Sequence, residues 1–259
     1  MSMPSTLPSL ALIDFGMQWI GWAIAVLLRT EKFYDLTGSS TFILVICLCY
    51  RWHSHGHPRH VVQTSAILIW AVRLGLYLFS RILADGKDRR FDKIRDDPVR
   101  FFFAWTIQGA WVLVTLLPSL LCLTNNRQPA LGLRDYLGWG VWGVGLLVEV
   151  VADHQKAAFR RDPANHDKFI TTGLWSLSRH PNYAGEIILW YGLYLSASAS
   201  FTGYQHLSVL SPTLVYLLIK FVSGVPMLED HGRRKWGASA QYQQYLRQTP
   251  VLFPYWHSN

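Results

Sequence analysis

Long apolar runs separated by short polar segments dominate the chain. A helix needs about 20 mainly apolar residues to cross the hydrocarbon core of a bilayer. On this pattern we predict seven transmembrane helices, at residues 10–28, 40–52, 61–83, 101–123, 136–152, 183–201 and 207–228, of which the second is the shortest. The sequence therefore predicts an all-α, polytopic membrane helix bundle.

The distribution of lysine and arginine along the chain predicts its orientation. Lys and Arg accumulate in cytoplasmic loops of membrane proteins. With the N-terminus outside, the inside segments hold seventeen basic residues and the outside loops hold four, namely Arg51, Arg59, Arg127 and Arg134. This asymmetry favours seven spans, an outside N-terminus and a cytosolic C-terminus.

Composition agrees with a membrane protein and argues against other classes. The chain is 51% hydrophobic and only 15% charged, against about 25% charged residues in soluble domains. Its net charge of +8 suggests nucleic acid, but the basic residues lie in short loops and no nucleic-acid-binding motif accompanies them. We expect one membrane-embedded domain over residues 1–259, in a bacterial inner membrane or the endoplasmic reticulum, with membrane lipids as partners and no prediction of oligomeric state.

We predict no metal site and no disulfide framework. The cysteines number three and lie in or at the end of apolar runs. Four histidines, His53, His55, His57 and His60, have no cysteine or carboxylate nearby in the sequence. We interpret their segment as an exposed loop.

Polar residues inside the predicted spans repeat at intervals of one helical turn. Such residues are costly in a bilayer and mark pairing or function. They are Asp14 with Gln18, Arg73 with Tyr77 and Arg81, and Glu149 with Asp153. A salt bridge between helices would explain any single pair. Several such rows of polar residues, each a stripe along one helix face, favour a solvated cavity in so small a bundle.

The segment 153–186 is the most polar of the predicted inside segments. Lys156 and Arg160 lie one turn apart, and these two cations suit a phosphate group. Asn182, Tyr183 and Glu186 follow at the head of a predicted helix, whose N-terminus attracts anions. A basic loop on anionic lipid is the alternative, but it does not account for these last three residues. We predict a cytosolic ligand that carries phosphate.

The C-terminal segment alternates charged and aromatic residues. It contains Glu229 and Asp230, a basic run from Arg233, and aromatic side chains at Tyr242, Tyr245 and within 253–256. Aromatic faces and cations suit a nucleotide, and they equally suit a helix anchored at the membrane interface.

The sequence GLWSLSRHPNYAGEIILWYG at 173–192 resembles the cofactor motif of the membrane reductases of the steroid 5α-reductase and sterol reductase superfamily. The segments at 30–39, 73–81, 86–98 and 224–237 resemble a microbial branch of that family, so the resemblance covers nearly the whole chain. It implies a seven-helix enzyme that binds NADPH in a cytosol-facing cavity and admits a steroid from the bilayer.

The resemblance also implies roles for individual residues. The cofactor portion corresponds to about 153–259 and the substrate-side helices to about 10–123. Positions that match cofactor contacts, or lie in the same motifs, are Arg160, Lys168, Arg179, His180, Asn182, Tyr183, Glu186, Glu229, Asp230, Arg233 and Arg234, to which the spacing argument adds Lys156. The candidates for the substrate carboxylate and tyrosine are Glu31 or Asp35 with Tyr34, and Tyr77.

The expected reaction is reduction of the C4=C5 double bond of a 3-oxo-Δ4 steroid. Hydride reaches the β-carbon of the enone, and a donor such as Tyr34 or Tyr77 stabilises the charge that develops on the carbonyl oxygen. Two alternatives stand beside it: an S-adenosylmethionine-dependent methyltransferase of the isoprenylcysteine type, which shares the RHP-x-Y-x-G pattern, and a non-catalytic sterol-binding protein. Asn182, Glu186 and the segments near 30–39 and 88–91 favour the reductase.

Overall fold

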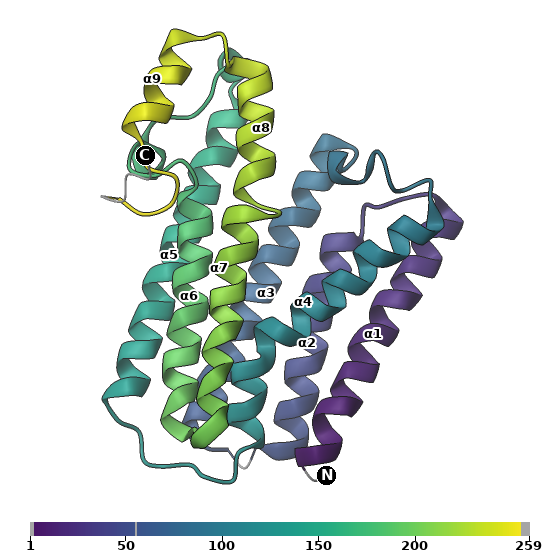
Figure 1. The fold of residues 1–259 in the computed structure, drawn as a ribbon, viewed down its shortest axis with the longest axis vertical. Helices are drawn as coiled ribbons and strands as arrows, with labels where there is room; N and C mark the ends of the chain where they lie inside the picture. Colours follow the sequence, from purple (N-terminus) through teal and green to yellow (C-terminus); the bar gives the residue numbers. More distant parts are fainter. Residues whose placement is uncertain (1–2, 55, 255–259) are drawn as a thin grey trace. The chain divides into compact units, whose positions relative to one another are not determined.

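The computed structural model describes residues 3–54 and 56–254, and the regular elements in this part of the chain are all helical, which confirms the all-α prediction (Figure 1). The α-helices are α1 (Met3–Leu28), α2 (Tyr34–His53), α3 (Pro58–Asp85), α4 (Pro98–Thr124), α5 (Leu133–Arg161), α6 (Pro181–Ala197), α7 (Leu210–Phe221), α8 (Val225–Trp236) and α9 (Ala240–Gln248). Short 3-10 turns are η1 (Arg89–Phe91), η2 (Pro163–Asn165), η3 (Gly173–Ser176), η4 (Ser198–Ser200) and η5 (Gly203–Val209).

The chain is an integral, multi-pass membrane protein. Five stretches of the described chain are long and apolar enough to cross a bilayer: Ser5–Leu28, Pro58–Asp85, Pro98–Thr124, Leu133–Arg161 and Gly203–Trp236. Large apolar side chains cover their outer faces; Leu27, for example, is 82% exposed and Leu133 is 73% exposed. Water would disfavour so much exposed apolar surface, whereas lipid accepts it.

The predicted run 40–52 falls in α2. The predicted run 183–201 extends past the end of α6 at Ala197 into the η4 turn, and the last predicted run is interrupted. We expected one helix over 207–228, but η5 ends at Val209, α7 ends at Phe221 and α8 begins at Val225. Gly224 precedes α8, and a side chain there would meet the carbonyl oxygen of Ile219 at 2.8 Å. Pro226 stands in the first turn of α8, where the N–H that it lacks is not needed.

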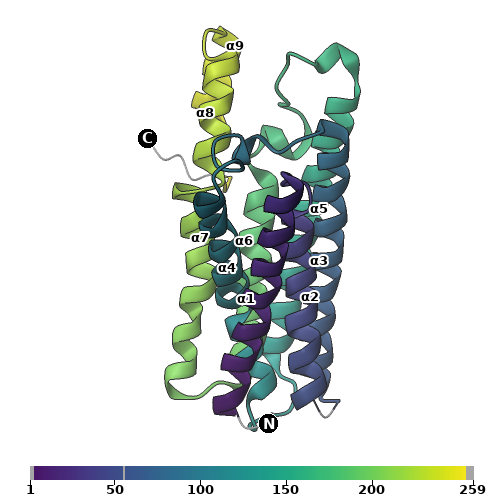
Figure 2. The ribbon, with the colours of Figure 1, turned by 90° about the vertical axis from the view of Figure 1, so that its right-hand side faces the viewer.

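The chain forms two compact units, which are described separately. The first comprises the chain up to Asp135 together with Ser196–Ser211. Within it α1 packs on α2 and α4, and α2 packs on α3 (Figure 1, Figure 2). Aromatic rings fill one end of this bundle, where Trp105 and Phe101 are fully buried beside Phe91 and Tyr34.

The second unit comprises Tyr136–Leu195 and the chain from Pro212 onward. Its helices α5 and α6 approach each other through glycines. A Cβ atom added to Gly145 would lie 2.5 Å from the backbone nitrogen of Leu189, and one added to Gly185 would lie 2.6 Å from that of Glu149. Such contacts between small residues are typical of helices that pack within a bilayer.

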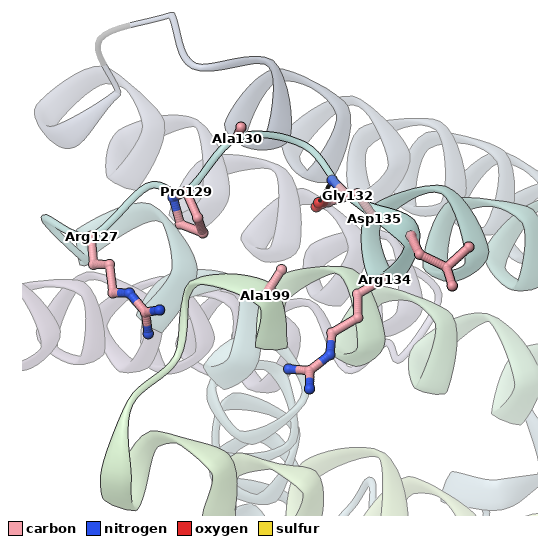
Figure 3. Close-up of a pocket in the computed structure, with 8 residues that line it drawn as sticks. Arg127, Pro129, Ala130, Gly132, Arg134, Asp135 and Ala199 are labelled. Atoms are coloured by element: carbon pink, nitrogen blue, oxygen red, sulfur yellow. Dashed lines mark hydrogen bonds between the residues drawn. The ribbon is translucent and has the colours of Figure 1, made fainter.

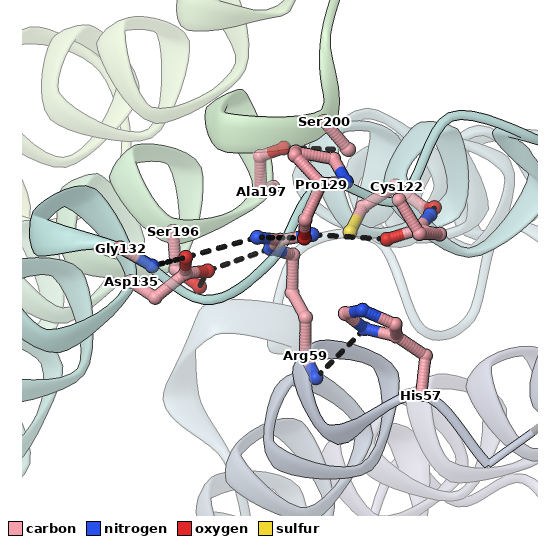
Figure 4. Close-up of polar contacts among 10 residues, drawn as sticks. His57, Arg59, Cys122, Pro129, Gly132, Asp135, Ser196, Ala197 and Ser200 are labelled. Atoms are coloured by element: carbon pink, nitrogen blue, oxygen red, sulfur yellow. Dashed lines mark hydrogen bonds and ion pairs between the residues drawn. The ribbon is translucent and has the colours of Figure 1, made fainter.

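A buried ion pair closes one end of the first unit (Figure 4). Arg59 and Asp135 have side chains that are 0% and 1% exposed, and Arg59 Nε lies 2.6 Å from Asp135 Oδ1. The guanidinium also donates to Asp135 Oδ2, to Gln128 Oε1 and to the carbonyl of Pro129. The carboxylate accepts the backbone N–H of Gly132. Each charge is therefore paired and hydrogen-bonded, as burial requires.

This arrangement corrects the prediction of an exposed histidine loop. Because α3 begins at Pro58, Arg59 and His60 belong to its first turn and both are buried. His57 caps the helix by accepting the N–H of Arg59, and His53 ends α2. His55 lies outside the described residues. The described residues contain no group of three or more His, Cys, Asp or Glu arranged to hold a metal ion.

Candidate functional site

The head of α6 carries the residues that the sequence singled out most strongly. Gly173 has φ +63, a conformation that favours glycine, and starts the η3 turn. Two residues before α6, the backbone N–H of Arg179 donates to the carbonyl of Pro250, and that of His180 donates to Val251. Pro181 then opens α6, where its missing N–H is not needed. The chain that follows α9 therefore fixes the position of this motif.

Glu229 of α8 binds the side chains that precede α6. Its Oε2 accepts from Arg179 Nη1 at 2.7 Å, and its Oε1 lies 3.0 Å from His180 Nε2. The imidazole stacks on the ring of Tyr183. Burial lowers the pKa of His180 below its ordinary value, although the hydrogen bond and charge of Glu229 oppose that shift. The structure thus brings Arg179, His180, Tyr183 and Glu229 together.

Asn182 connects the head of α6 to α5. Its Nδ2 donates to Asp153 Oδ1 at 3.1 Å. Asp153 is buried in α5, one turn after the buried Glu149. Glu186 lies one turn beyond Asn182 on α6 and is half-buried.

Several polar atoms in this cluster are buried without a hydrogen-bond partner among the described residues. They are Arg179 Nε, His180 Nδ1 and Asn182 Oδ1. Each such atom costs about 1–3 kcal/mol unless water or a ligand satisfies it. Arg179 Nε is a donor, Asn182 Oδ1 is an acceptor and His180 Nδ1 is an imidazole nitrogen. A bound polar ligand is able to form hydrogen bonds with all three.

Lys156 and the aromatic residues around Trp175 border the cluster within the second unit. Lys156 Nζ lies 4.5 Å from the centre of the Trp175 ring, and Trp175 donates its indole N–H to the carbonyl of Ala152. Tyr245 of α9 donates to the carbonyl of Trp175, and Tyr242 packs edge-on against Phe169. These rings tie α9 to the segment before α6. Tyr255 and Trp256 lie outside the described residues.

The other predicted phosphate contacts lie on the surface. Arg160, Lys168 and Arg233 are exposed. Asp230 and Arg234, one turn apart on α8, form an exposed ion pair at 2.6 Å, a type of pair that contributes little to stability. The structure therefore does not bring Asp230 or Arg234 into the buried cluster.

In the first unit, the catalytic candidates Glu31 and Asp35 are bound by arginines of the segment between α3 and α4. Glu31 is buried and accepts the backbone N–H of Asp88 and the side chain of Arg95. Asp35 Oδ2 lies 2.6 Å from Arg90 Nη2. Burial would raise the pKa of Asp88, but the hydrogen bonds and charge of Arg90 hold it below its ordinary value. Sequence reasoning did not identify Arg90 or Arg95 as partners, because the pairs join residues far apart in the chain.

The two candidate tyrosines differ in their surroundings. Tyr34 donates its hydroxyl to the carbonyl of Ala104 at 2.9 Å and packs between Phe91 and Trp105. Tyr77 is half-buried on α3, and the guanidinium of Arg73 lies 5.3 Å from its ring centre. The polar stripe predicted on this helix is therefore present, with Arg81 one turn beyond, 3.9 Å from Asp35.

The curated proteins that resemble this chain include a sterol reductase and a probable methyltransferase. The delta(14)-sterol reductase of Candida albicans is 24% identical over 225 residues, which cover 81% of this chain and 45% of that protein. A probable O-methyltransferase of Ustilaginoidea virens is 34% identical over 115 residues, which cover 39% of this chain and 40% of that protein. The chain thus spans less than half the length of either relative. No solved structure matches it significantly.

A family match covers most of the sequence. The family described as "Protein of unknown function (DUF1295)" matches residues 21–249, so the chain belongs to this family.

Proposed function

We propose that this chain is an NADPH-dependent membrane reductase that reduces a carbon–carbon double bond conjugated to a carbonyl, in a steroid or sterol-like substrate of the 3-oxo-Δ4 type. The observation that carries the proposal is the cluster at the head of α6, in which three neighbouring side chains present buried polar atoms without a partner among the described residues. Similarity to a sterol reductase over 81% of the chain supports it.

The cluster suits the amide end of a nicotinamide cofactor. A carboxamide offers an N–H donor and a carbonyl acceptor, which complement the Asn182 Oδ1 acceptor and the Arg179 Nε donor. Both side chains are already oriented, Asn182 by Asp153 and Arg179 by Glu229. A site that is oriented before binding loses less entropy when the ligand arrives.

Lys156, Arg160, Lys168 and Arg233, which belong to the same unit as the cluster, would hold the phosphate groups of the cofactor. Basic residues also favour NADPH over NADH, because the additional 2′-phosphate binds Arg or Lys. When bound, NADPH would supply the hydride for the β-carbon of the substrate.

The protein's own residues then handle charge and protons. A tyrosine hydroxyl donates to the substrate carbonyl oxygen and stabilises the negative charge that develops there. We assign this role to Tyr77, a half-buried tyrosine on the polar stripe of α3, where the guanidinium of Arg73 lies 5.3 Å from its ring centre. A proton delivered to the α-carbon completes the reduction, so that one hydride and one proton are added across the double bond.

We also propose that the chain crosses the membrane seven times, with the N-terminus outside and the head of α6 facing the cytosol. This orientation follows the seventeen-to-four asymmetry of basic residues between the two sides. It exposes the cluster to the compartment where NADPH is found.

Thermal unfolding of the detergent-purified chain tests the cofactor. A ligand that binds only the folded state raises the melting temperature in proportion to the logarithm of its concentration. NADPH is expected to stabilise the protein at lower concentration than NADH, and S-adenosylmethionine is expected to have no effect. Stabilisation by a steroid alone, with none by NADPH, would instead indicate a sterol-binding protein without catalysis.

A second candidate function is S-adenosylmethionine-dependent methyl transfer. The observation that favours it is the 34% identity to a probable O-methyltransferase. A rise in melting temperature with S-adenosylmethionine and none with NADPH would replace the reductase by this function.

A further inference from the structure

An open surface cavity of about 410 Å³ lies where α4 is joined to α5 (Figure 3). Arg127 and Arg134 line it on either side of Ala199, and Leu133 and Asp135 also contribute to its wall. Because it is open rather than enclosed, it suits a group that binds at the surface of the protein. All these residues belong to the first compact unit.

The cavity carries a net positive charge. Asp135 is the only carboxylate that lines it, and its charge is neutralised by Arg59 at 2.6 Å. Arg127 donates one N–H to the carbonyl of Phe201 at 3.3 Å and has no carboxylate partner within the described chain. Arg134 is exposed and has no hydrogen-bond or ion-pair partner among the residues that the structure covers. Two guanidinium groups are therefore available to one anion.

The loop that carries Arg127 is held in place by its neighbours. Asn125 Nδ2 donates to the carbonyl of Ser200 at 2.7 Å and to Gln205 at 3.0 Å. Its Oδ1 accepts the backbone N–H of Arg127. Gln128 bonds the end of α4 through the carbonyl of Cys122. These bonds fix the loop that carries Arg127, and Arg134 stands in the first turn of α5.

The position of the cavity indicates where the anion comes from. The loop connects two stretches that are able to span a bilayer, Pro98–Thr124 and Leu133–Arg161, so it lies at a membrane surface, at the level of lipid phosphates. Leu133, which lines the cavity and is 73% exposed, offers an apolar edge to the acyl or glycerol part of a lipid. Arginine binds phosphate oxygens with its planar fork of N–H groups.

We propose that this cavity binds the phosphate group of an anionic phospholipid, with Arg127 and Arg134 as its ligands. Free phosphate has the same charged group but lacks the apolar part that Leu133 contacts. The two sources are therefore distinguishable by experiment.

Native mass spectrometry of the detergent-purified full chain, titrated with phosphatidylglycerol, tests the site. Phosphatidylcholine and inorganic phosphate serve as the other two probes. We expect tighter retention of phosphatidylglycerol than of phosphatidylcholine, and no competition from millimolar inorganic phosphate. The double variant Arg127→Gln/Arg134→Gln is expected to bind phosphatidylglycerol about 25-fold more weakly, since each arginine near a membrane surface contributes about fivefold.

Arg51→Gln is the matched control, because Arg51 is an exposed arginine in the last turn of α2 and does not line the cavity. Arg51→Gln is expected to leave phosphatidylglycerol binding unchanged. Each single cavity variant is expected to bind phosphatidylglycerol about fivefold more weakly. The single variants keep the test valid if the double variant does not fold. Unchanged affinity in the cavity variants, an equal loss in Arg51→Gln, or equal retention of phosphatidylcholine would overturn the site. Competition by inorganic phosphate would overturn the assignment to a lipid.

Discussion

The Arg59–Asp135 pair and the Arg179–His180–Glu229 cluster contain similar chemical groups and differ in how completely those groups are satisfied. Arg59 donates to Asp135, Gln128 and Pro129, and none of its polar atoms is buried without a partner. Arg179, in contrast, leaves its Nε unpaired within the described residues, as His180 leaves its Nδ1. We interpret the fully satisfied pair as structural and the incompletely satisfied cluster as the proposed ligand site. Substitutions in the two groups should therefore differ in what they change, stability for the pair and ligand binding for the cluster.

Asp135→Asn is expected to cause the largest loss of stability, about 3–5 kcal/mol, because it leaves a buried guanidinium without its counter-charge. Unfolding in detergent with increasing denaturant measures the loss. The double variant Arg59→Met/Asp135→Leu is expected to recover part of it, since it removes both buried charges. Equal stability of Asp135→Asn and the wild type would show that the pair has no structural role.

Tyr77→Phe is expected to reduce steroid turnover about a hundredfold, as loss of one donor to a developing oxyanion does, while NADPH still raises the melting temperature. Tyr34→Phe is the matched control. It removes the hydrogen bond to Ala104 and is expected to cost about 1 kcal/mol of stability with little effect on turnover. The opposite result, with turnover lost only in Tyr34→Phe, would transfer the donor role to Tyr34.

Asn182→Ala is expected to weaken NADPH binding about tenfold, because it removes one hydrogen bond to the ligand and the orienting contact with Asp153. Titration of the melting temperature with NADPH measures the change. Asn165→Ala provides the comparison, since Asn165 donates to the carbonyl of Phe159 in a surface turn. If both variants bind NADPH like the wild type, the cluster at the head of α6 is not the cofactor site.

Acid is expected to destabilise the protein through His180. Burial lowers the pKa of this residue in the folded state, so the unfolded chain takes up a proton first as the pH falls below about 6.5. The stability that the neutral imidazole provides is thus complete above pH about 6.5 and declines as the pH falls toward the lower folded pKa. Melting temperatures between pH 8 and 5 are expected to fall less in His180→Asn than in the wild type. His154→Asn, which changes an exposed histidine of α5, should retain the wild-type slope.

Helices that depend on local apolar pattern were predictable from the sequence, and contacts between distant segments were not. The run 101–123 lies within α4 because about 20 consecutive apolar residues leave few alternatives. The break between α7 and α8 was missed, although Ser223, Gly224 and Pro226 mark it, because the average hydropathy of 207–228 hides a local interruption.

The residues at the head of α6 were identified because their motif is contiguous in the sequence. The pairing of Arg59 with Asp135 was not foreseen, since 76 residues separate the two. Arg59 was counted among loop cations, but the start of α3 at Pro58 places it inside the bundle. Tyr34 was a candidate donor on sequence grounds, and only the structure revealed that its hydroxyl donates to the carbonyl of Ala104.

The glycine contacts between α5 and α6 set the spacing within the proposed site. Because backbone meets backbone at Gly145 and Gly185, a larger side chain at either position would force the two helices apart. Asp153 and Asn182 are carried one on each helix, so their 3.1 Å hydrogen bond would then lengthen or break. The orientation of Asn182 toward a ligand therefore depends on two residues that have no side chain of their own.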